Sequence, residues 1–335
     1  MNDRKNLGAF DIFRIIAAIL VIAIHTSPLW SVNAAANHFV TGVAARIAVP
    51  FFFAMTGYFS DLRTAAGLEK TAAKTAALYA VAIAIYLPFN TYAANLKMLL
   101  FDGAFFHLWY FPACVFGAAI VYALTKLPKK AAFSAAAALY VIGLFGDSYY
   151  RFVSGIPPIN AVYSVFFKVF SSTRNGLFFA PVFMLIGTAL REHRLGENRF
   201  AAAVGLTVSM LLLTLESFLL YRFGIAGNMY VFLIPSTIYL FEFLASFKVK
   251  PHPLLRRSSM WIYVIHPIII HLLGAAAELF GAENFAGQYS LLRFTLATVI
   301  SIAAALAITR VTEHLKCRKK LSAIKPEANA ANVPR

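Results

Sequence analysis

Residues 9–29 read AFDIFRIIAAILVIAIHTSPL, and this apolar run decides the fold class of the chain. A helix of about 20 mainly apolar residues crosses the roughly 30 Å hydrocarbon layer of a membrane. The run is too long for the apolar part of a signal peptide, it contains Asp11 and Arg14, and no small-residue cleavage site follows it. We therefore expect a retained membrane-spanning helix.

Nine further runs of this kind follow, each bounded by charged residues or by clusters of Pro and Gly. Together they predict spans at residues 9–29, 38–60, 72–91, 105–125, 131–148, 174–191, 200–221, 229–247, 259–280 and 291–313. The sequence thus predicts an all-α polytopic membrane protein with about ten transmembrane helices. We expect one transmembrane domain over residues 1–316 and a basic, disordered cytoplasmic tail over residues 317–335, which is rich in Ala, Asn and Pro.

The composition excludes a soluble enzyme. Of the 335 residues, 60% are hydrophobic and 13% are charged, whereas about 25% of the residues in an ordinary soluble domain are charged. The net charge of +16 would indicate a nucleic-acid partner in a soluble protein. In a polytopic protein it follows from basic cytoplasmic loops, so we expect the lipid bilayer and no nucleic acid as a partner. Two cysteines are too few for a cysteine zinc site, and we expect no metal.

The distribution of basic residues predicts the orientation. If the ten spans start from a cytoplasmic N-terminus, 22 of the 30 Lys and Arg residues fall on the inside, six on the outside and two within spans. A missed span would move every later loop to the opposite side of the membrane and remove this bias. The unequal distribution of Lys and Arg therefore supports the span assignment. Both termini are predicted to be cytoplasmic.

Polar residues inside the spans are the informative ones, because burying a charge in the bilayer costs about 3 kcal/mol even on the lenient insertion scale. Asp11 and Arg14 are three residues apart and can pair on one helix face. Arg14 and His25 are eleven residues apart, which is three helical turns, so they share a face about 16 Å apart along the axis. An imidazole exchanges a proton near neutral pH, so His25 suits general-base catalysis.

Four residues are expected at a similar depth in the outer half of the membrane. They are His25, Arg46, His107 and Glu216, and they could line one cavity that opens to the outside. A structural interpretation of Arg46 is pairing with another buried charge, and His107 could anchor the protein at the membrane interface.

His266 is expected at mid-depth, directly before Pro267. Its imidazole could have a functional role in the site, or it could have the structural role of satisfying backbone carbonyls that Pro267 leaves without a donor.

Four motifs, in the same order and on matching spans, resemble the acyltransferase 3 family of integral membrane acyltransferases. They are Asp11-x-x-Arg14-x10-His25, Val49-Pro-Phe-Phe-Phe-Ala-Met-Thr-Gly-Tyr58, His107-Leu-Trp109-Tyr110-Phe-Pro112 and Ser258-Ser-x-Trp-x-Tyr263-x-Ile-His266-Pro267. In the second motif Thr56 replaces the family's Ser. At the start of the third span, Lys70 and Lys74 stand where the family often has an arginine pair.

The resemblance implies transfer of an acyl group, most often acetyl, from cytoplasmic acyl-CoA to a hydroxyl of a cell-envelope glycan, in the inner membrane of a bacterium. Acetyl-CoA or another acyl-CoA would be the co-substrate. His25 would be the general base, Glu216 would orient it or position the acceptor, and Arg46 would stabilise the oxyanion.

The donor and the acceptor would be bound by further residues. The donor's phosphates would meet the cations Arg14, Lys70, Lys74, Arg256 and Arg257. Substrate-binding residues implied by the motifs are His107, Trp109, Tyr110, Tyr263 and His266.

Within the family, the chain is most similar to the membrane portion of the vancomycin-resistance serine racemases, which has been regarded as a route for serine entry. Because the sequence ends at residue 335, we expect no racemase domain. A transporter for a small polar solute such as L-serine is therefore the alternative function, since buried ionisable residues also line solute pathways. A purely structural scaffold is the third alternative.

Overall fold

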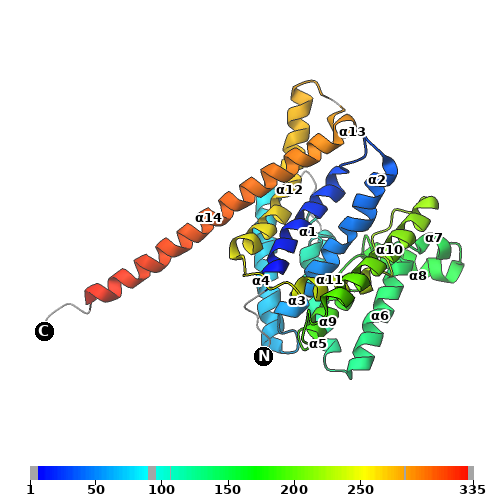
Figure 1. Ribbon diagram of the computed structural model, residues 1–335, viewed down its shortest axis with the longest axis horizontal. Coiled ribbons are helices and arrows are strands. Elements are labelled where there is room, and N and C mark those ends of the chain that lie inside the picture. The colour runs from blue at the N-terminus through cyan, green and yellow to red at the C-terminus, as the bar shows by residue number, and fades with distance from the viewer. Residues whose placement is uncertain (1–6, 90–95, 106, 283, 331–335) are drawn as a thin grey trace.

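The computed structural model describes residues 7–89, 96–105, 107–282 and 284–330, and most of them are helical (Figure 1). The helices are α1 (Gly8–Thr26), α2 (Ala34–His38), η2 (Phe39–Val43), η3 (Ala44–Ile47), α3 (Ala48–Phe59), α4 (Ala65–Tyr86), η4 (Leu87–Phe89), η5 (Met98–Asp102), α5 (Tyr110–Leu124), α6 (Lys129–Phe145), α7 (Tyr150–Val153), α8 (Pro157–Val169), α9 (Ala180–Leu190), α10 (Arg199–Arg222), α11 (Leu233–Ala245), α12 (Pro253–Leu279), α13 (Phe285–Gln288) and α14 (Ser290–Ala330). The predicted fold class is confirmed: the chain is an all-α, multi-pass membrane protein.

Each of the ten predicted spans contains a helix, and within the described residues six helical segments are long and apolar enough to cross a membrane. These six are Gly8–Thr26, Ala34–Phe59, Ala65–Phe89, Arg199–Arg222, Pro253–Leu279 and Ser290–Arg318. Residues 90, 91 and 106, which belong to two of the predicted spans, lie outside the described residues.

Helix α9 is shorter than its predicted span, because residues 174–179 form turns and the helix begins at Ala180. The Asn175 side chain accepts hydrogen bonds from the backbone N–H groups of Leu177 and Phe178 (2.9 and 3.1 Å), which offers the backbone an alternative to the helix. Eleven residues of helix span only about 16 Å. Irregular backbone at membrane depth is tolerated where protein covers it, and Phe178 and Phe179 are buried.

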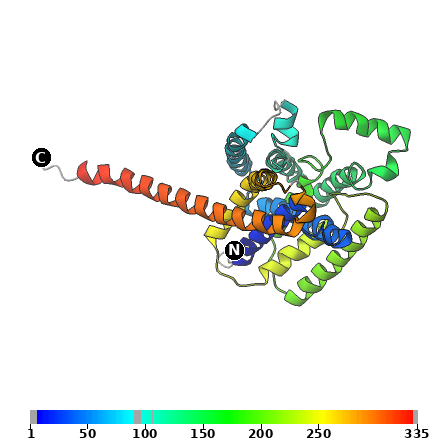
Figure 2. The same cartoon turned by 90° about the horizontal axis from the view of Figure 1, so that it is seen from above.

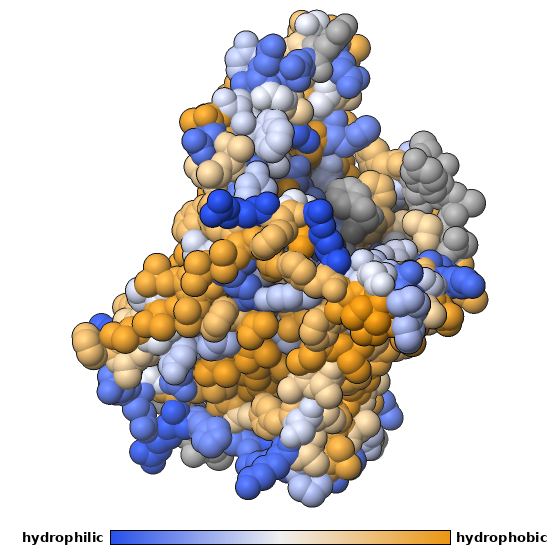
Figure 3. Space-filling view, turned by 90° about the vertical axis from the view of Figure 1, so that its right-hand side faces the viewer, coloured by the Kyte–Doolittle hydropathy of each residue, from blue (hydrophilic) through white to orange (hydrophobic). Residues whose placement is uncertain are grey.

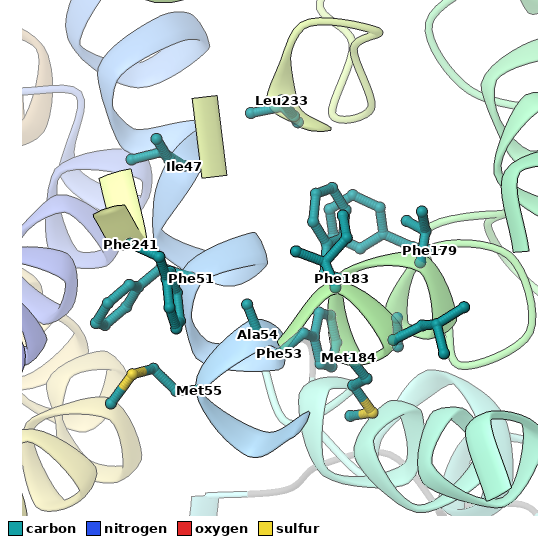
Figure 4. Packing of buried hydrophobic residues seen from close by; sticks show 14 of the residues in the cluster. Ile47, Phe51, Phe53, Ala54, Met55, Phe179, Phe183, Met184, Leu233 and Phe241 are labelled. Carbon is teal, nitrogen blue, oxygen red and sulfur yellow. The ribbon is translucent and has the colours of Figure 1, made fainter. Parts of the chain in front are cut away.

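Helices α3 and α9 pack closely against each other at the centre of the apolar core. Figure 4 shows Phe51 of α3 beside Phe241 on one side of this core, and Phe183 and Met184 of α9 on the other. The ring of Phe53, also on α3, lies 5.9 Å from that of Phe179. A methyl group added to Gly57 would lie 1.9 Å from the Met184 carbonyl oxygen. The glycine of the Val49–Tyr58 motif therefore permits close helix packing.

The second predicted span is helical throughout but not a regular α-helix. Between α2 and α3 the chain passes through a π-helical turn, η2, and a 3₁₀ turn, η3, and Arg46 lies in the latter. The hydroxyl of Ser217, on α10, donates to the Gly42 carbonyl oxygen (3.0 Å) in the wider turn. A polar group of a neighbouring helix thus satisfies backbone that the irregular turns leave open.

The outer surface of the bundle is apolar where it meets lipid. Phe200, Leu211 and Leu215 on α10 are all more than half exposed, at spacings that place them on one helix face. Figure 3 shows hydrophobic residues in a broad band across one face of the molecule, with hydrophilic residues above and below it. This is the surface expected of a protein with lipid as its lateral solvent.

Helix α12 packs against α1 on one side and α14 on the other. Beyond this contact α14 continues away from the bundle to Ala330, as Figures 1 and 2 show from two directions. The division of the chain into a domain over residues 1–316 and a tail stays a prediction.

Candidate functional site

Three histidines from three separate parts of the sequence meet in the interior. His25 is in the last turn of α1, His107 precedes α5 and His266 is in the middle of α12. The ring centroid of His266 lies 5.3 Å from that of His25 and 5.4 Å from that of His107. The structure therefore brings together the histidines of three of the four motifs, and we call them the histidine cluster.

Pro267 determines how the His266 ring is held. Proline has no N–H group, so the carbonyl oxygen of Tyr263 lacks its usual helical donor. The His266 Nδ1 atom lies 2.9 Å from this oxygen and 3.1 Å from the Ile262 oxygen. Nδ1 is therefore the donor in the neutral ring, and Nε2 has no hydrogen-bond partner among the described residues. The structural role expected for His266 beside Pro267 is present, and its ring still faces the cluster.

A cavity of about 460 Å³ lies on one side of the histidine cluster. Side chains of α1, α3, α4, α5 and α12 line it, and four cations are among them: Arg14, Lys70, Lys74 and Arg191. We call it the cationic cavity. Its inner wall includes Tyr110 and Tyr263, and the Tyr263 ring lies 6.2 Å from the His266 ring. The cavity therefore leads from a group of positive charges to the edge of the histidine cluster.

Asp11 pairs mainly with a different cation from the one expected. The sequence spacing suggests pairing with Arg14, yet the two charged groups are 4.0 Å apart. Arg256 instead makes two hydrogen bonds to the Asp11 carboxylate (2.8 and 3.0 Å), which is the bidentate geometry that arginine favours. The strong pair with Arg256 leaves the Arg14 side chain in the wall of the cationic cavity.

The five residues expected to bind the donor thus divide into two groups. Arg14, Lys70 and Lys74 line the cationic cavity. Arg256 and Arg257 do not line it, and each is engaged with a carboxylate, that of Asp11 and that of Glu313 respectively. Donor binding by the latter two stays a prediction.

A second cavity, of about 420 Å³, lies on the other side of the histidine cluster and is wider open. We call it the vestibule, and its lining is His25, Thr26, Ser27, Trp30, Ala286, Gly287 and Arg293. Val21 lines the cationic cavity and His25 lines the vestibule. These two residues are one helical turn apart on α1, about 6 Å along the axis. His25 and its neighbours thus form a thin partition between two cavities.

Arg46 belongs to a buried polar network that includes a second arginine. Arg46 and Arg174 both donate to the side-chain oxygen of Asn228 (2.6 and 3.0 Å). Asp147 holds Asn228 in place by accepting from its backbone N–H (2.6 Å) and its amide (3.1 Å). The two guanidinium groups therefore share one side-chain acceptor, which also contacts the Asp147 carboxylate.

Glu216 is placed differently from its expected role beside the general base. Its carboxylate accepts hydrogen bonds from the Tyr149 hydroxyl (2.6 Å) and from the backbone N–H groups of Val231 and Phe232 (2.7 and 3.1 Å). These two residues directly precede α11, so Glu216 holds the turn that leads into that helix. Orientation of the base by Glu216 stays a prediction.

The aromatic residues of the third motif connect the network to the cavities. The guanidinium group of Arg174 lies 4.6 Å from the Trp109 ring centroid, within the range of a cation–π contact. The Tyr110 ring is 5.6 Å from the Tyr263 ring, and both line the cationic cavity. The Tyr263 hydroxyl donates to the backbone carbonyl of His107.

The structure also shows site residues that the sequence patterns do not indicate. Arg174 and Arg293 look like loop cations in the sequence, yet one joins the buried network and the other lines the vestibule. Arg191 ends α9 and lines the cationic cavity, where it donates to the Ser60 carbonyl oxygen (3.1 Å).

Comparisons with known proteins find curated relatives that match most of this chain. Over 339 residues the chain is 35% identical to an amino-acid racemase of Enterococcus faecalis. This alignment covers 95% of the chain and 47% of that protein. It is 32% identical over 290 residues to a serine/alanine racemase of Enterococcus gallinarum, covering 79% of this chain and 41% of that protein. The chain thus spans about half the length of these curated relatives. No solved structure gives a significant match.

The acyltransferase domain of the acyltransferase 3 family matches residues 7–310. This range contains the histidine cluster, both cavities and the buried arginine network. The chain is a member of the acyltransferase 3 family of membrane proteins.

Proposed function

We propose that the chain is a membrane O-acyltransferase that moves an acyl group, acetyl in the simplest case, from acyl-CoA to a hydroxyl of a cell-envelope glycan. The observation that carries the proposal is that His25 lines the vestibule and lies one helical turn from Val21, which lines the cationic cavity. A donor and an acceptor on different sides of a membrane need such an arrangement, since each reactant reaches the same base from its own compartment.

The cationic cavity suits the donor. CoA carries three phosphate groups, and the cavity wall holds Arg14, Lys70, Lys74 and Arg191. The inward bias of Lys and Arg favours a cytoplasmic position for this end of the bundle, where acyl-CoA is made, and the proposed location is the inner membrane of a bacterium. The thioester would then extend past Tyr110 toward the histidine cluster. Lysine meets a phosphate as a point charge, so Lys70 and Lys74 can replace the family's arginine pair with weaker geometric selection.

His25 is the proposed general base. As the acceptor oxygen attacks the thioester carbonyl carbon, His25 takes the hydroxyl proton. The new carbon–oxygen bond forms, the carbon–sulfur bond breaks, and the proton passes to the CoA thiolate that leaves. No covalent acyl-enzyme is needed in this sequence.

The buried arginines supply the charge that the reaction needs. Attack on the thioester develops negative charge on the carbonyl oxygen, and fixed positive groups lower its energy. Arg46 and Arg174 are held by Asn228, which Asp147 positions in turn. The proposal therefore extends the role expected of Arg46 to a pair of residues.

The direct test uses purified protein in nanodiscs with radiolabelled acetyl-CoA. We expect saturable binding that weakens in Arg14→Ala, and donor consumption that is lost in His25→Ala while binding remains. His271→Ala is the matched control, because His271 is exposed on α12. Transfer at the parent rate by His25→Ala would refute the base assignment.

The second candidate is a pathway for a small amino acid such as serine. The names of the relatives as amino-acid racemases favour it, and two cavities at opposite sides of a partition also suit a solute route. Labelled serine uptake into proteoliposomes, with no binding of acetyl-CoA to the same protein, would support this candidate over acyl transfer.

A further inference from the structure

Trp30 and Arg293 stand out among the residues of the vestibule. Trp30 is 61% exposed, although tryptophan is a large apolar side chain. Arg293 is half-buried, and its guanidinium group makes no hydrogen bond or ion pair with any residue in the described ranges. A half-buried cation with five donors and no protein acceptor is available to an anion.

The two residues are held in a fixed relation by Ser290. The Ser290 hydroxyl donates to the Pro28 carbonyl oxygen (3.0 Å) and lies 2.8 Å from the Ser31 hydroxyl. The Ser31 backbone N–H in turn donates to the Ser290 oxygen (3.1 Å). The loop that carries Trp30 is therefore fastened to the first turn of α14, one turn before Arg293. The vestibule is thus built by long-range contacts rather than by a free loop.

We infer that the acceptor is an anionic saccharide, whose carboxylate or phosphate group binds to Arg293 while its ring packs against Trp30. A guanidinium group binds either anion with charge-assisted hydrogen bonds. The C–H groups of a sugar ring pack on an aromatic face, and the indole offers a large one. This placement puts the saccharide in the same cavity as His25, the proposed base. The inference rests on the proposed acyltransferase function and narrows its acceptor.

A different occupant of these residues is the membrane itself. Tryptophan gathers at the level of lipid headgroups, and arginine extends toward lipid phosphates. The lining of the vestibule argues against this, because Trp30 and Arg293 share the cavity with Thr26 and Ser27 at the end of α1. The test therefore uses a detergent whose headgroup has neither a phosphate nor a sugar, so that no lipid phosphate competes for Arg293.

The experiment compares three acceptors that share one ring: methyl glucoside, its uronic acid methyl glucuronide, and glucose 6-phosphate. Acetyl transfer from acetyl-CoA gives kcat and KM for each. We expect the parent to have a KM for the two anionic acceptors about tenfold or more below that for methyl glucoside, as a charge-assisted hydrogen bond provides. A preference for one of the two anions would separate carboxylate from phosphate recognition.

Variants assign the preference to the two residues. Arg293→Gln should raise the KM for the two anionic acceptors to about that for methyl glucoside, whereas Arg293→Lys should retain part of their advantage. Trp30→Ala should raise the KM for all three acceptors, and Trp30→Phe should restore most of the loss. Arg222→Gln is the matched control, because Arg222 is exposed at the end of α10 and its loss changes the net charge equally.

Three results would overturn the inference alone: equal KM values for neutral and anionic acceptors, equal effects of Arg293→Gln and Arg222→Gln, or no transfer to anionic saccharides while His25-dependent consumption of acetyl-CoA persists. Absence of any acetyl-CoA binding or consumption would instead refute the proposed function, and the inference with it.

Discussion

The imidazole rings of His25 and His266 lie 5.3 Å apart, although 241 positions separate the two residues. They differ in how they are held. His266 is fixed through Nδ1 to backbone carbonyls of its own helix, whereas His25 lines the vestibule at the end of α1. A base must reach its substrate, so the ring at the cavity is the better candidate and the fixed ring is a positioning residue.

Substitution of the two histidines should separate these roles. We expect His25→Ala to lower acetyl transfer by about 10²-fold or more, the usual contribution of a general base. His266→Asn should cost less activity, because its amide can still donate to the Tyr263 oxygen. His266→Ala leaves that buried oxygen without a donor and should lower stability by about 1–3 kcal/mol.

The measurements are transfer rates and thermal unfolding of each variant in the same detergent. If His266→Asn lost as much activity as His25→Ala without loss of stability, the assignment of base and positioning residue would have to be exchanged.

Arg14 should act on donor binding rather than on the chemical step. A contact with a CoA phosphate is the same in the ground state and the transition state, so its loss raises KM and leaves kcat unchanged. We expect Arg14→Gln to raise the KM for acetyl-CoA about tenfold, the value of one charge-assisted hydrogen bond. Arg14→Lys should recover part of the affinity.

Arg256→Gln serves as the comparison for Arg14→Gln, because Arg256 pairs with Asp11 and does not line the cationic cavity. It should lower the melting temperature with little effect on the KM for acetyl-CoA. A larger KM effect in Arg256→Gln than in Arg14→Gln would reassign the phosphate contact.

The sequence predicts the fold class and the positions of the helices well, because each membrane helix satisfies its own backbone and needs its own apolar run. Arg14 and His25 could be related in advance, since both are on one helix whose pitch is known. His107 could be related to His25 by its expected depth in the membrane, whereas His266 could be connected to His25 only through the family motifs. The contacts among these three depend on helix packing, which no local spacing encodes.

The buried arginine network could not be predicted from the sequence. Asp147, Arg174 and Asn228 lie near the ends of three different apolar runs, where charged residues normally meet water. Arg174 therefore looks like an external loop residue. Arg174 is buried because α9 begins late, at Ala180. The Asn175 side chain binds the backbone of Leu177 and Phe178, which lie in the turn before α9.

Asp147 should be the most sensitive member of this network. Its carboxylate is linked to the two buried guanidinium groups through the Asn228 amide, and it accepts from the backbone N–H groups of Asn228 and Met229 (2.6 and 3.0 Å). We expect Asp147→Asn to destabilise the protein by about 1–3 kcal/mol, the cost of leaving buried donors without a full acceptor. Glu313→Gln, which breaks the exposed pair with Arg257, should cost less than about 1 kcal/mol. Equal melting temperatures for the two variants would argue against a buried charge network.

The proposed orientation can be checked without any activity. If the cationic cavity opens to the cytoplasm, both termini are cytoplasmic. A fluorescent protein fused after residue 335 should then fluoresce in the cell, and alkaline phosphatase fused there should be inactive. A fusion within the loop between α1 and α2 should give the opposite pair of results. Active phosphatase at the C-terminus would reverse the assignment of donor and acceptor sides.

The close contact between α3 and α9 should make the protein less stable when a side chain replaces a glycine there. At Gly57 a Cβ atom would lie 1.9 Å from the carbonyl oxygen of Met184, and at Gly187 one would lie 2.0 Å from that of Ala54. The clash is with backbone, so a side chain cannot rotate away, and the two helices must separate. We expect Gly57→Ala to cost about 1–3 kcal/mol, as overpacking of a core does.

Gly274→Ala is the matched control for Gly57→Ala, since Gly274 is also in a helix but has nothing within 4 Å of the position of a Cβ atom. Alanine there should raise stability by up to about 1 kcal/mol through helix propensity. Thermal unfolding of both variants in one detergent measures the difference. Because α3 carries Thr56 and Met55 in the wall of the cationic cavity, Gly57→Ala should also weaken acetyl-CoA binding. A Gly57→Ala protein as stable as Gly274→Ala would show that the two helices do not pack at this distance.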